Sequence, residues 1–243
     1  MTNLIYFSPR GGTKKYIQAF KSAKEEFLEW DLTYNEPGTI QLKQEELLII
    51  AFPVYYGRVP LLFLQRLEAL RGNNTPAIIL AVYGNRDFDD ALLEMKDFLI
   101  KRAFIPYGGA ALVAKHSYGH IQTHRPSAED IKEVEVFIKR ALDPCKEAKF
   151  YDFPGNVPYK ERGKSSFFPS TTDECILCKA CVRSCPSSAI DEEIHTIKDK
   201  CISCMACLDV CPVDARVLSE EFHDFVKDFS EKIKEPRENV FFL

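Results

Sequence analysis

The sequence predicts an α/β fold in which a doubly wound, five-stranded parallel sheet is followed by a small α+β module. Two observations support this. First, apolar runs of strand length alternate five times with amphipathic helical stretches in the first 145 residues or so, and such strands joined by helical crossovers form a parallel sheet covered on both faces. Second, a cysteine motif occurs twice between residues 171 and 217.

Each element has its own signal in the chain. Near-continuous apolar runs predict strands, and apolar residues at helical spacing predict helices. The expected strands are residues 3–7, a weaker one at 30–34, then 47–52, 77–82 and 110–114. The expected helices are one with Tyr16, Ile17, Phe20, Ala23 and Phe27 on its apolar face, then residues 60–70, 88–102 and 127–142.

Capping residues support the last two helices. Asp87 is expected to be the N-cap of the third helix, with Asp90 three residues on. Ser127 follows Pro126 and has Asp130 in the capping-box position. We therefore expect both helices to begin at these residues.

The chain divides into four parts by composition. Residues 1–145 form the α/β domain, and residues 146–170 form a linker broken by Pro and Gly, whose aromatic residues are expected to pack on the domains. Residues 171–217 hold the cysteine repeat, and residues 218–243 form a C-terminal helix and tail. This helix, expected at 218–233, has Phe222, Phe225 and Phe229 on one side for docking on a domain.

Composition excludes some classes of function. A formal charge of −4 over 243 residues leaves no basic surplus for binding nucleic acid. The N-terminus has no signal-peptide pattern, and no apolar run is long enough to cross a bilayer. We expect a cytoplasmic protein, so the nine cysteines indicate metal or redox chemistry rather than disulfides.

Eight of the cysteines form two copies of the run C-x2-C-x2-C-x3-C-P, offset by 26 residues. This spacing is typical of bacterial ferredoxins, in which the fourth cysteine binds the other [4Fe–4S] cluster. Three thiolates on a tight loop bind one cluster, and Pro186 and Pro212 turn the chain away after the fourth. The ligands of cluster one are predicted to be Cys175, Cys178, Cys181 and Cys211; those of cluster two are Cys201, Cys204, Cys207 and Cys185.

Zinc is the main alternative, because paired C-x2-C motifs also build zinc sites. Such sites separate their pairs by a dozen or more residues and need neither the third cysteine nor the x3-C-P ending, so the spacing favours iron–sulfur. Disulfides are a weaker alternative. Cys145 belongs to neither motif and is expected to be an ordinary free thiol.

Three loops follow strands at one edge of the predicted sheet, where ligands of such folds bind. Ser8-Pro9-Arg10-Gly11-Gly12-Thr13-Lys14 opens a helix, and its hydroxyls and glycines would let backbone N–H groups surround a phosphate, although a plain strand-to-helix turn explains the loop about as well. Aromatic residues and glycines follow the third and fourth strands. These two loops are Pro53-Val54-Tyr55-Tyr56-Gly57-Arg58-Val59-Pro60 and Tyr83-Gly84-Asn85-Arg86-Asp87.

With these loops and the cysteine repeat, the chain resembles the bacterial and archaeal family in which a flavodoxin-like domain is fused to a two-cluster ferredoxin. The resemblance implies an FMN site, in which Ser8, Arg10, Gly11, Gly12 and Thr13 hold the phosphate. It further implies that Pro53, Val54, Tyr55, Tyr56 and Gly57 line the ring, with Tyr55 or Tyr56 stacking on it, and that Tyr83, Gly84, Asn85, Arg86 and Asp87 contact its polar edge.

One departure from the flavodoxin pattern concerns the phosphate loop. Pro9 and Arg10 replace small or hydroxylated residues, so the loop loses one N–H donor and gains a charged one. A flavodoxin-like domain without flavin therefore stays an alternative.

The loop 116–120 follows the last predicted strand at the same edge and contains His116 and His120. We consider His116 a candidate proton donor near the ring. The favoured function is electron transfer between FMN, two [4Fe–4S] clusters and a redox partner protein. The alternatives are a ferredoxin-fed flavin reductase of a quinone or small organic oxidant and, last, a redox sensor.

Overall fold

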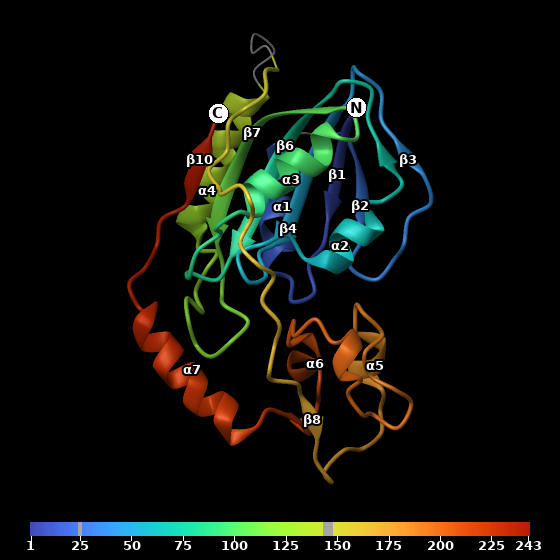
Figure 1. Ribbon diagram of the computed structural model, residues 1–243, viewed down its shortest axis with the longest axis vertical. Coiled ribbons are helices and arrows are strands. Elements are labelled where there is room, and N and C mark those ends of the chain that lie inside the picture. Colours follow the sequence, from blue (N-terminus) through green and yellow to red (C-terminus); the bar gives the residue numbers. More distant parts are fainter. Residues whose placement is uncertain (24–25, 143–147) are drawn as a thin grey trace.

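The computed structural model describes residues 1–23, 26–142 and 148–243, so Cys145 lies outside the described residues. At its centre is a six-stranded sheet in the order β10-β7-β6-β4-β1-β2 (Figure 1). Within this sheet, β1, β2, β4, β6 and β7 are parallel, and β10 pairs with β7 in the antiparallel direction. The strands are β1 (Thr2–Tyr6), β2 (Phe27–Asp31), β4 (Leu47–Pro53), β6 (Thr75–Tyr83), β7 (Phe104–Val113) and β10 (Val240–Phe242).

The five parallel strands have the spatial order 2-1-3-4-5 when numbered among themselves, which is the order of flavodoxin-like folds. This confirms the predicted doubly wound parallel sheet. The sixth strand was not predicted, because its three residues near the end of the chain carry no signal beyond two phenylalanines.

Helices cover both faces of the sheet (Figure 1). On one face lie α1 (Gly12–Ala23) and α4 (Ala128–Ala141), which bury Tyr16, Phe20 and Phe137 against the strands. On the other lie α2 (Leu61–Arg66) and α3 (Ala91–Ile100), which bury Phe63 and Met95. The two apolar layers are continuous, because the central strands have buried side chains on both faces.

Two helix predictions need correction. Asp87 is not the N-cap of α3: its carboxylate accepts a bond from the Asp89 backbone N–H, and Asp89 has a φ of 39°, so the helix begins only at Ala91. The helix predicted at 60–70 ends at Arg66, because Leu70 pairs with Ile40 in the short parallel pair of β3 (Ile40–Gln41) and β5 (Leu70–Arg71). In both places tertiary contacts override the helical pattern.

The second strand lies at a different position from the predicted one, whereas the start of α4 matches the prediction. The second strand runs from Phe27 to Asp31 rather than over 30–34, because it pairs residue by residue with β1; Phe27 therefore does not belong to α1. The capping box of α4 is confirmed, with the Ser127 hydroxyl accepting from the Asp130 N–H and the Asp130 carboxylate accepting from the Ser127 N–H.

The cysteine-rich module lies below the sheet edge that the phosphate loop occupies (Figure 1). It contains β8 (Ser170–Thr171), α5 (Ala180–Arg183), a 3-10 helix η1 (Lys198–Lys200), α6 (Ala206–Asp209) and β9 (Arg216–Val217), and β8 pairs with β9. After it, α7 (Glu220–Lys232) leads the chain back to the sheet, which β10 completes. Among the described helices, none combines the length and apolarity that a bilayer crossing requires.

Candidate functional site

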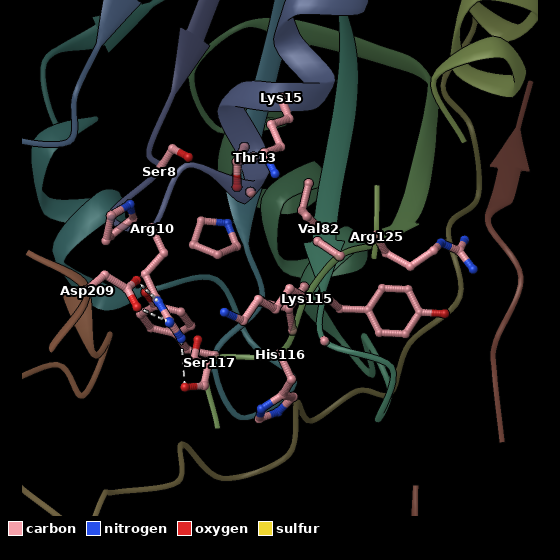
Figure 2. Close-up of a pocket in the computed structure, with 18 residues that line it drawn as sticks. Ser8, Arg10, Thr13, Lys15, Val82, Lys115, His116, Ser117, Arg125 and Asp209 are labelled. Atoms are coloured by element: carbon pink, nitrogen blue, oxygen red, sulfur yellow. Dashed lines mark hydrogen bonds and ion pairs between the residues drawn. The ribbon is translucent and has the colours of Figure 1, made fainter. Parts of the chain in front are cut away.

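A cavity of about 270 Å³ opens at the sheet edge beside the phosphate loop (Figure 2). Four loops form it, which follow β1, β4, β6 and β7, and one residue of the cysteine-rich module closes it. The residues that line it are Ser8, Pro9, Arg10, Gly12, Thr13, Lys15, Pro53, Val54, Tyr55, Val82, Tyr83, Gly84, Ala114, Lys115, His116, Ser117, Arg125 and Asp209. The loops predicted from the sequence therefore do converge.

The phosphate loop has the shape of an anion site. Gly11 has a φ of 80°, which favours glycine, and its N–H donates to the Ser8 carbonyl at 3.2 Å. The Ser8 hydroxyl accepts from the Lys14 N–H at 3.0 Å, which fixes the start of α1. The Thr13 hydroxyl is buried without a hydrogen-bond partner. A buried hydroxyl costs free energy unless it is bonded, so a phosphate oxygen at this helix N-terminus fits it.

Basic side chains dominate the lining of this cavity. The basic residues in the lining are Arg10, Lys15, Lys115 and Arg125, and the one acid in it is Asp209; Arg125 pairs with Asp130 outside the lining, at 2.5 Å. Arg10 forms a two-pronged ion pair with Asp209, both contacts at 2.5 Å, and also donates to the Ser117 carbonyl at 2.8 Å (Figure 2). The positive surplus suits a phosphate dianion, and the ion pair ties the cysteine-rich module to the phosphate loop.

The loop after β4 forms a tight two-residue turn. Tyr55 and Arg58 exchange both backbone hydrogen bonds at 3.0 Å, with Tyr56 and Gly57 at positive φ. A Cβ at Gly57 would collide with the carboxylate of Asp89. The turn holds Tyr55 in the cavity lining and directs Tyr56 outward, where its hydroxyl lies 3.4 Å from that of Tyr118. Tyr55 is therefore the better placed of the two for stacking.

A second cavity, of about 180 Å³, continues from the first past Tyr55 and His116. Its walls also include Tyr118 and the C-terminal helix residues Phe225 and Phe229. Protein atoms surround the Tyr55 phenol, which borders both cavities, and this burial raises its pKa well above the usual value. The second cavity therefore adds an aromatic space beside the first.

The loop after β6 lines the first cavity with some of its residues and binds the C-terminal segment with another. Tyr83 and Gly84 line the first cavity, and a Cβ at Gly84 would collide with the His116 ring. Asn85 is buried, donates to the carbonyls of Ile233 and Glu235 at 2.6 and 2.9 Å, and accepts from the Arg237 N–H at 2.8 Å. Its side chain therefore holds the segment between α7 and β10 instead of facing the cavity.

Two further predicted residues of that loop also lie outside the first cavity. Arg86 pairs with Asp89 and borders the second cavity, and Asp87 pairs with Arg237 at 3.2 Å. Gly11, Tyr56 and Gly57 are absent from the lining of the first cavity as well. The predicted ligand roles of these residues stay predictions.

His116 borders both cavities, whereas His120 is exposed and borders neither. The His116 Nδ1 accepts from the Tyr118 N–H at 2.8 Å, and its ring contacts the rings of Tyr118 and Phe229. Burial lowers its pKa to about 4. At neutral pH the imidazole is therefore uncharged and carries its proton on Nε2, since Nδ1 is the acceptor.

None of the eight motif cysteines forms a disulfide. The two copies of the motif have the same backbone, because residues 26 positions apart share a left-handed conformation. The pairs are Leu177 and Ser203 at 54° and 53°, Lys179 and Met205 at 58° and 63°, and Ser188 and Asp214 at 49° and 52°. The internal repeat in sequence is thus a repeat in structure.

The surroundings of the thiols fit cluster ligands. The fourth cysteines, Cys185 and Cys211, each accept a backbone N–H on Sγ at 3.2 Å, from Ala189 and Ala215. Such bonds stabilise thiolate charge and tune iron–sulfur potentials. Within the described residues, no three His, Cys, Asp or Glu side chains are grouped closely enough to bind a single metal ion.

A buried arginine, Arg216, lies inside the module. It donates to the Ile194 carbonyl at 2.9 Å and to the Thr171 and Thr196 hydroxyls at 2.6 Å, while its Nε has no partner. Burial raises the thiol pKa values of Cys181 and Cys207, the latter to about 11, and the charge of Arg216 opposes this rise. Sequence reasoning missed this residue.

The thiols differ in burial. Cys181, Cys204 and Cys207 are buried, and burial raises the pKa of Cys204 to about 12. Cys178 is exposed. The half of the module that contains Cys185 contacts the sheet edge, where Arg66 donates to the Pro186 carbonyl at 2.5 Å and to the Thr33 carbonyl at 2.6 Å.

Several other lining residues were missed by sequence reasoning. Lys115 and Ser117 flank His116 in the loop that the sequence placed at this edge, so their position could have been expected. No sequence pattern indicated Arg125 or Asp209. Arg125 lies in the loop before α4, and Asp209 reaches the cavity only because the cysteine-rich module docks there.

Comparison with known protein families identifies the cysteine-rich region. Residues 170–212 match the family described as the 4Fe-4S dicluster domain. The chain therefore joins a sheet of flavodoxin-like strand order to a dicluster ferredoxin region. A comparison with curated protein sequences found no match.

Solved structures with similar folds are distant. A candidate flavoprotein from Bacteroides uniformis is 16% identical, with a TM-score of 0.41, and the match covers 57% of this chain and 97% of that one. The Trp repressor binding protein from Bacillus subtilis is 13% identical, with a TM-score of 0.35 and coverages of 60% and 100%. A flavodoxin from the domain Archaea is 14% identical, with a TM-score of 0.34 and coverages of 56% and 91%.

Proposed function

We propose that this chain is an electron-transfer protein, in which FMN and two [4Fe–4S] clusters exchange electrons with each other and with an external redox partner. One observation carries the proposal. The cysteine-rich module is fixed over the mouth of the phosphate-loop cavity, where Asp209 from α6 pairs with Arg10 at 2.5 Å. This contact brings the two candidate cofactor sites together.

The cluster assignment rests on the repeated motif. We assign Cys175, Cys178, Cys181 and Cys211 to cluster one, and Cys201, Cys204, Cys207 and Cys185 to cluster two. The equal backbone conformations of the two repeats and the N–H bonds to Cys185 and Cys211 support it. In this assignment, cluster two lies in the half of the module beside the sheet. Cluster one lies in the other half, which contains the exposed Cys178.

The FMN assignment rests on the cavity. Thr13, Ser8 and the backbone of Gly11 and Gly12 would hold the phosphate, with Arg10 and Lys15 supplying positive charge. The ring would lie between the loops that follow β4 and β7. Tyr55 would stack on it, and the aromatic side chains of α7 would exclude water.

Such a combination has a clear chemical use. FMN exchanges one or two electrons and each cluster exchanges one, so together they connect one-electron and two-electron partners. Joining the sites on one chain gives them a high effective concentration. Arg66 and Arg10 hold the module in one orientation through Pro186 and Asp209.

The test is an anaerobic stopped-flow experiment on the flavin-loaded, iron-loaded protein. After a pulse of a one-electron reductant, flavin and cluster absorbance should reach equilibrium at a rate independent of protein concentration, because transfer is intramolecular. Replacing Cys204 with Ser should remove cluster two and abolish this phase. A rate proportional to protein concentration would argue against internal transfer.

A second function is favoured by the aromatic cavity beside the candidate ring site. It has room for a small planar oxidant such as a quinone, and the neutral His116 borders it with Nε2 as proton donor. In that case His116→Gln should lower turnover with a quinone while leaving internal electron exchange unchanged. Equal loss of both would leave simple electron transfer as the function.

A further inference from the structure

A third cavity, of about 490 Å³, lies on the other side of Tyr55 from the phosphate-loop cavity and shares Tyr55, Tyr56, Ile202 and Ser203 with the second cavity. Among the described residues, Tyr55 alone lines both this cavity and the phosphate-loop cavity. The turn at Tyr56, the start of α2, the linker and the loop before Cys204 form its walls. The lining residues are Tyr55, Tyr56, Pro60, Leu61, Arg162, Gly163, Lys164, Ser165, Phe168, Lys198, Asp199, Cys201, Ile202 and Ser203.

The floor of this cavity is apolar and partly uncovered. Leu61 is 55% exposed and Tyr56 is 38% exposed, although both side chains are large and hydrophobic. Phe168 and Ile202 complete this surface. Its size falls within the range of small-molecule sites, and its flat aromatic walls suit a planar ring.

The rim is positively charged. Three cations, Arg162, Lys164 and Lys198, face one acid, Asp199. Arg162 is occupied by Glu94 and by the Val59 carbonyl. Lys164 and Lys198 are exposed, and in the described parts of the chain no acid pairs with either of them. Two ammonium groups are thus available to an anion above an apolar floor.

The cavity is held in shape before any ligand arrives. Gly163 lies against the Tyr56 ring so closely that a Cβ there would come within 2.6 Å of the ring carbon Cδ1. The Arg162 guanidinium anchors the linker to Val59 and Glu94. A preformed site binds without the cost of ordering its walls.

We propose that this cavity binds a planar aromatic anion, such as an aromatic carboxylate, with its ring on Tyr56 and Leu61 and its charge at Lys164 and Lys198. Because Cys201 is part of the wall, the bound ring would lie against the loop that holds cluster two in the proposed assignment. Only this last consequence rests on the proposed function.

The test uses isothermal titration of the full, flavin-loaded and iron-loaded chain with 2-naphthoate and its neutral analogue 2-naphthamide. Naphthoate should bind more tightly than naphthamide. The double variant Lys164→Gln, Lys198→Gln should weaken naphthoate by about tenfold and leave naphthamide unchanged. Leu61→Trp, at an exposed position, should block both, and Lys139→Gln on α4 should change neither.

Four results would overturn the proposal: no binding to the wild-type chain, equal affinity for both probes, no effect of Leu61→Trp, or release of FMN as naphthoate binds. The last would place the probe in the flavin cavity. Iron and flavin are measured on the same samples. A fully loaded protein that fails to bind naphthoate therefore refutes this site while leaving the proposed function intact.

Discussion

Two side chains in the cavity lining have unusual properties: one buried hydroxyl lacks a hydrogen-bond partner, and one imidazole has a lowered pKa. Thr13 buries a hydroxyl with no partner, next to the helix N-terminus. His116 has a pKa of about 4, because protein surrounds the ring and the charged form is poorly solvated. Each observation leads to a test on one residue.

Thr13→Val should weaken FMN binding by about tenfold to a hundredfold, because a hydrogen bond to a charged oxygen contributes about 1.5–3 kcal/mol. Thr13→Ser should bind nearly as well as the wild type. The measurement is quenching of flavin fluorescence on titration of the apoflavin protein. Equal affinity in Thr13→Val would show that the phosphate does not use this hydroxyl.

The low pKa of His116 also predicts how stability depends on pH. The unfolded chain binds the proton below about pH 6.5 and the native chain only below about 4, so between these values native stability falls as pH falls. The full loss is up to about 3 kcal/mol. In denaturant unfolding at pH 7 and pH 4.5, His116→Gln should lose this dependence, while His120→Gln, at an exposed position, should keep it. An unchanged slope in His116→Gln would contradict the pKa.

At the scale of elements, the C-terminal segment holds the two halves of the molecule together. Phe222 and Phe225 of α7 contact Phe167 of the linker and Tyr118 of the sheet-edge loop. Beyond α7, β10 pairs with β7, and Phe242 packs on Tyr151 and Phe153. The strand thereby covers the edge of β7, which would otherwise be open to pairing.

Removing residues 239–243 should therefore destabilise the sheet, by about 2–4 kcal/mol for lost apolar contacts of the size of a half-buried phenylalanine pair. Val240→Ser keeps the backbone ladder and alters a side chain that is 39% exposed, so it should cost less than about 1 kcal/mol. Unfolding of both variants in urea provides the comparison. A truncated chain as stable as the wild type would mean that β10 is dispensable.

Elements with strong local signals were predictable from the sequence. The apolar strands of the parallel sheet and the Ser127 capping box follow from patterns within a few residues. The start of α3 was not predictable from the sequence, because the left-handed conformation of Asp89 and the contacts of Asp90 with the linker determine it. Nor was β10, whose pairing with β7 depends on residues more than 120 positions away.

The candidate site shows the same division. The loops at the sheet edge were predicted because parallel strands end there together. Asp209 and Arg216 were not, since their roles arise from how the module docks and folds on itself. Asn85 was assigned to the ring, but its side chain holds the C-terminal segment, which the sequence could not place.

At the scale of the whole molecule, the docking of the module should control electron exchange. Asp209→Ala removes the ion pair with Arg10 but no proposed cluster ligand. We expect internal exchange to slow severalfold with iron content unchanged, because the pair fixes α6 over the cavity; the loss in stability should stay below about 1 kcal/mol, since both side chains are partly exposed. Glu193→Ala, an exposed acid elsewhere in the module, is the control. An unchanged exchange rate in Asp209→Ala would show that the pair does not set the orientation.

Most directly, the account depends on both cofactor types being present on one chain. The decisive measurement is the iron, sulfide, zinc and flavin content of protein purified without oxygen. The account predicts eight irons and eight sulfides, from two four-iron clusters, together with one FMN per chain. Zinc in place of iron, or iron without flavin, would contradict it.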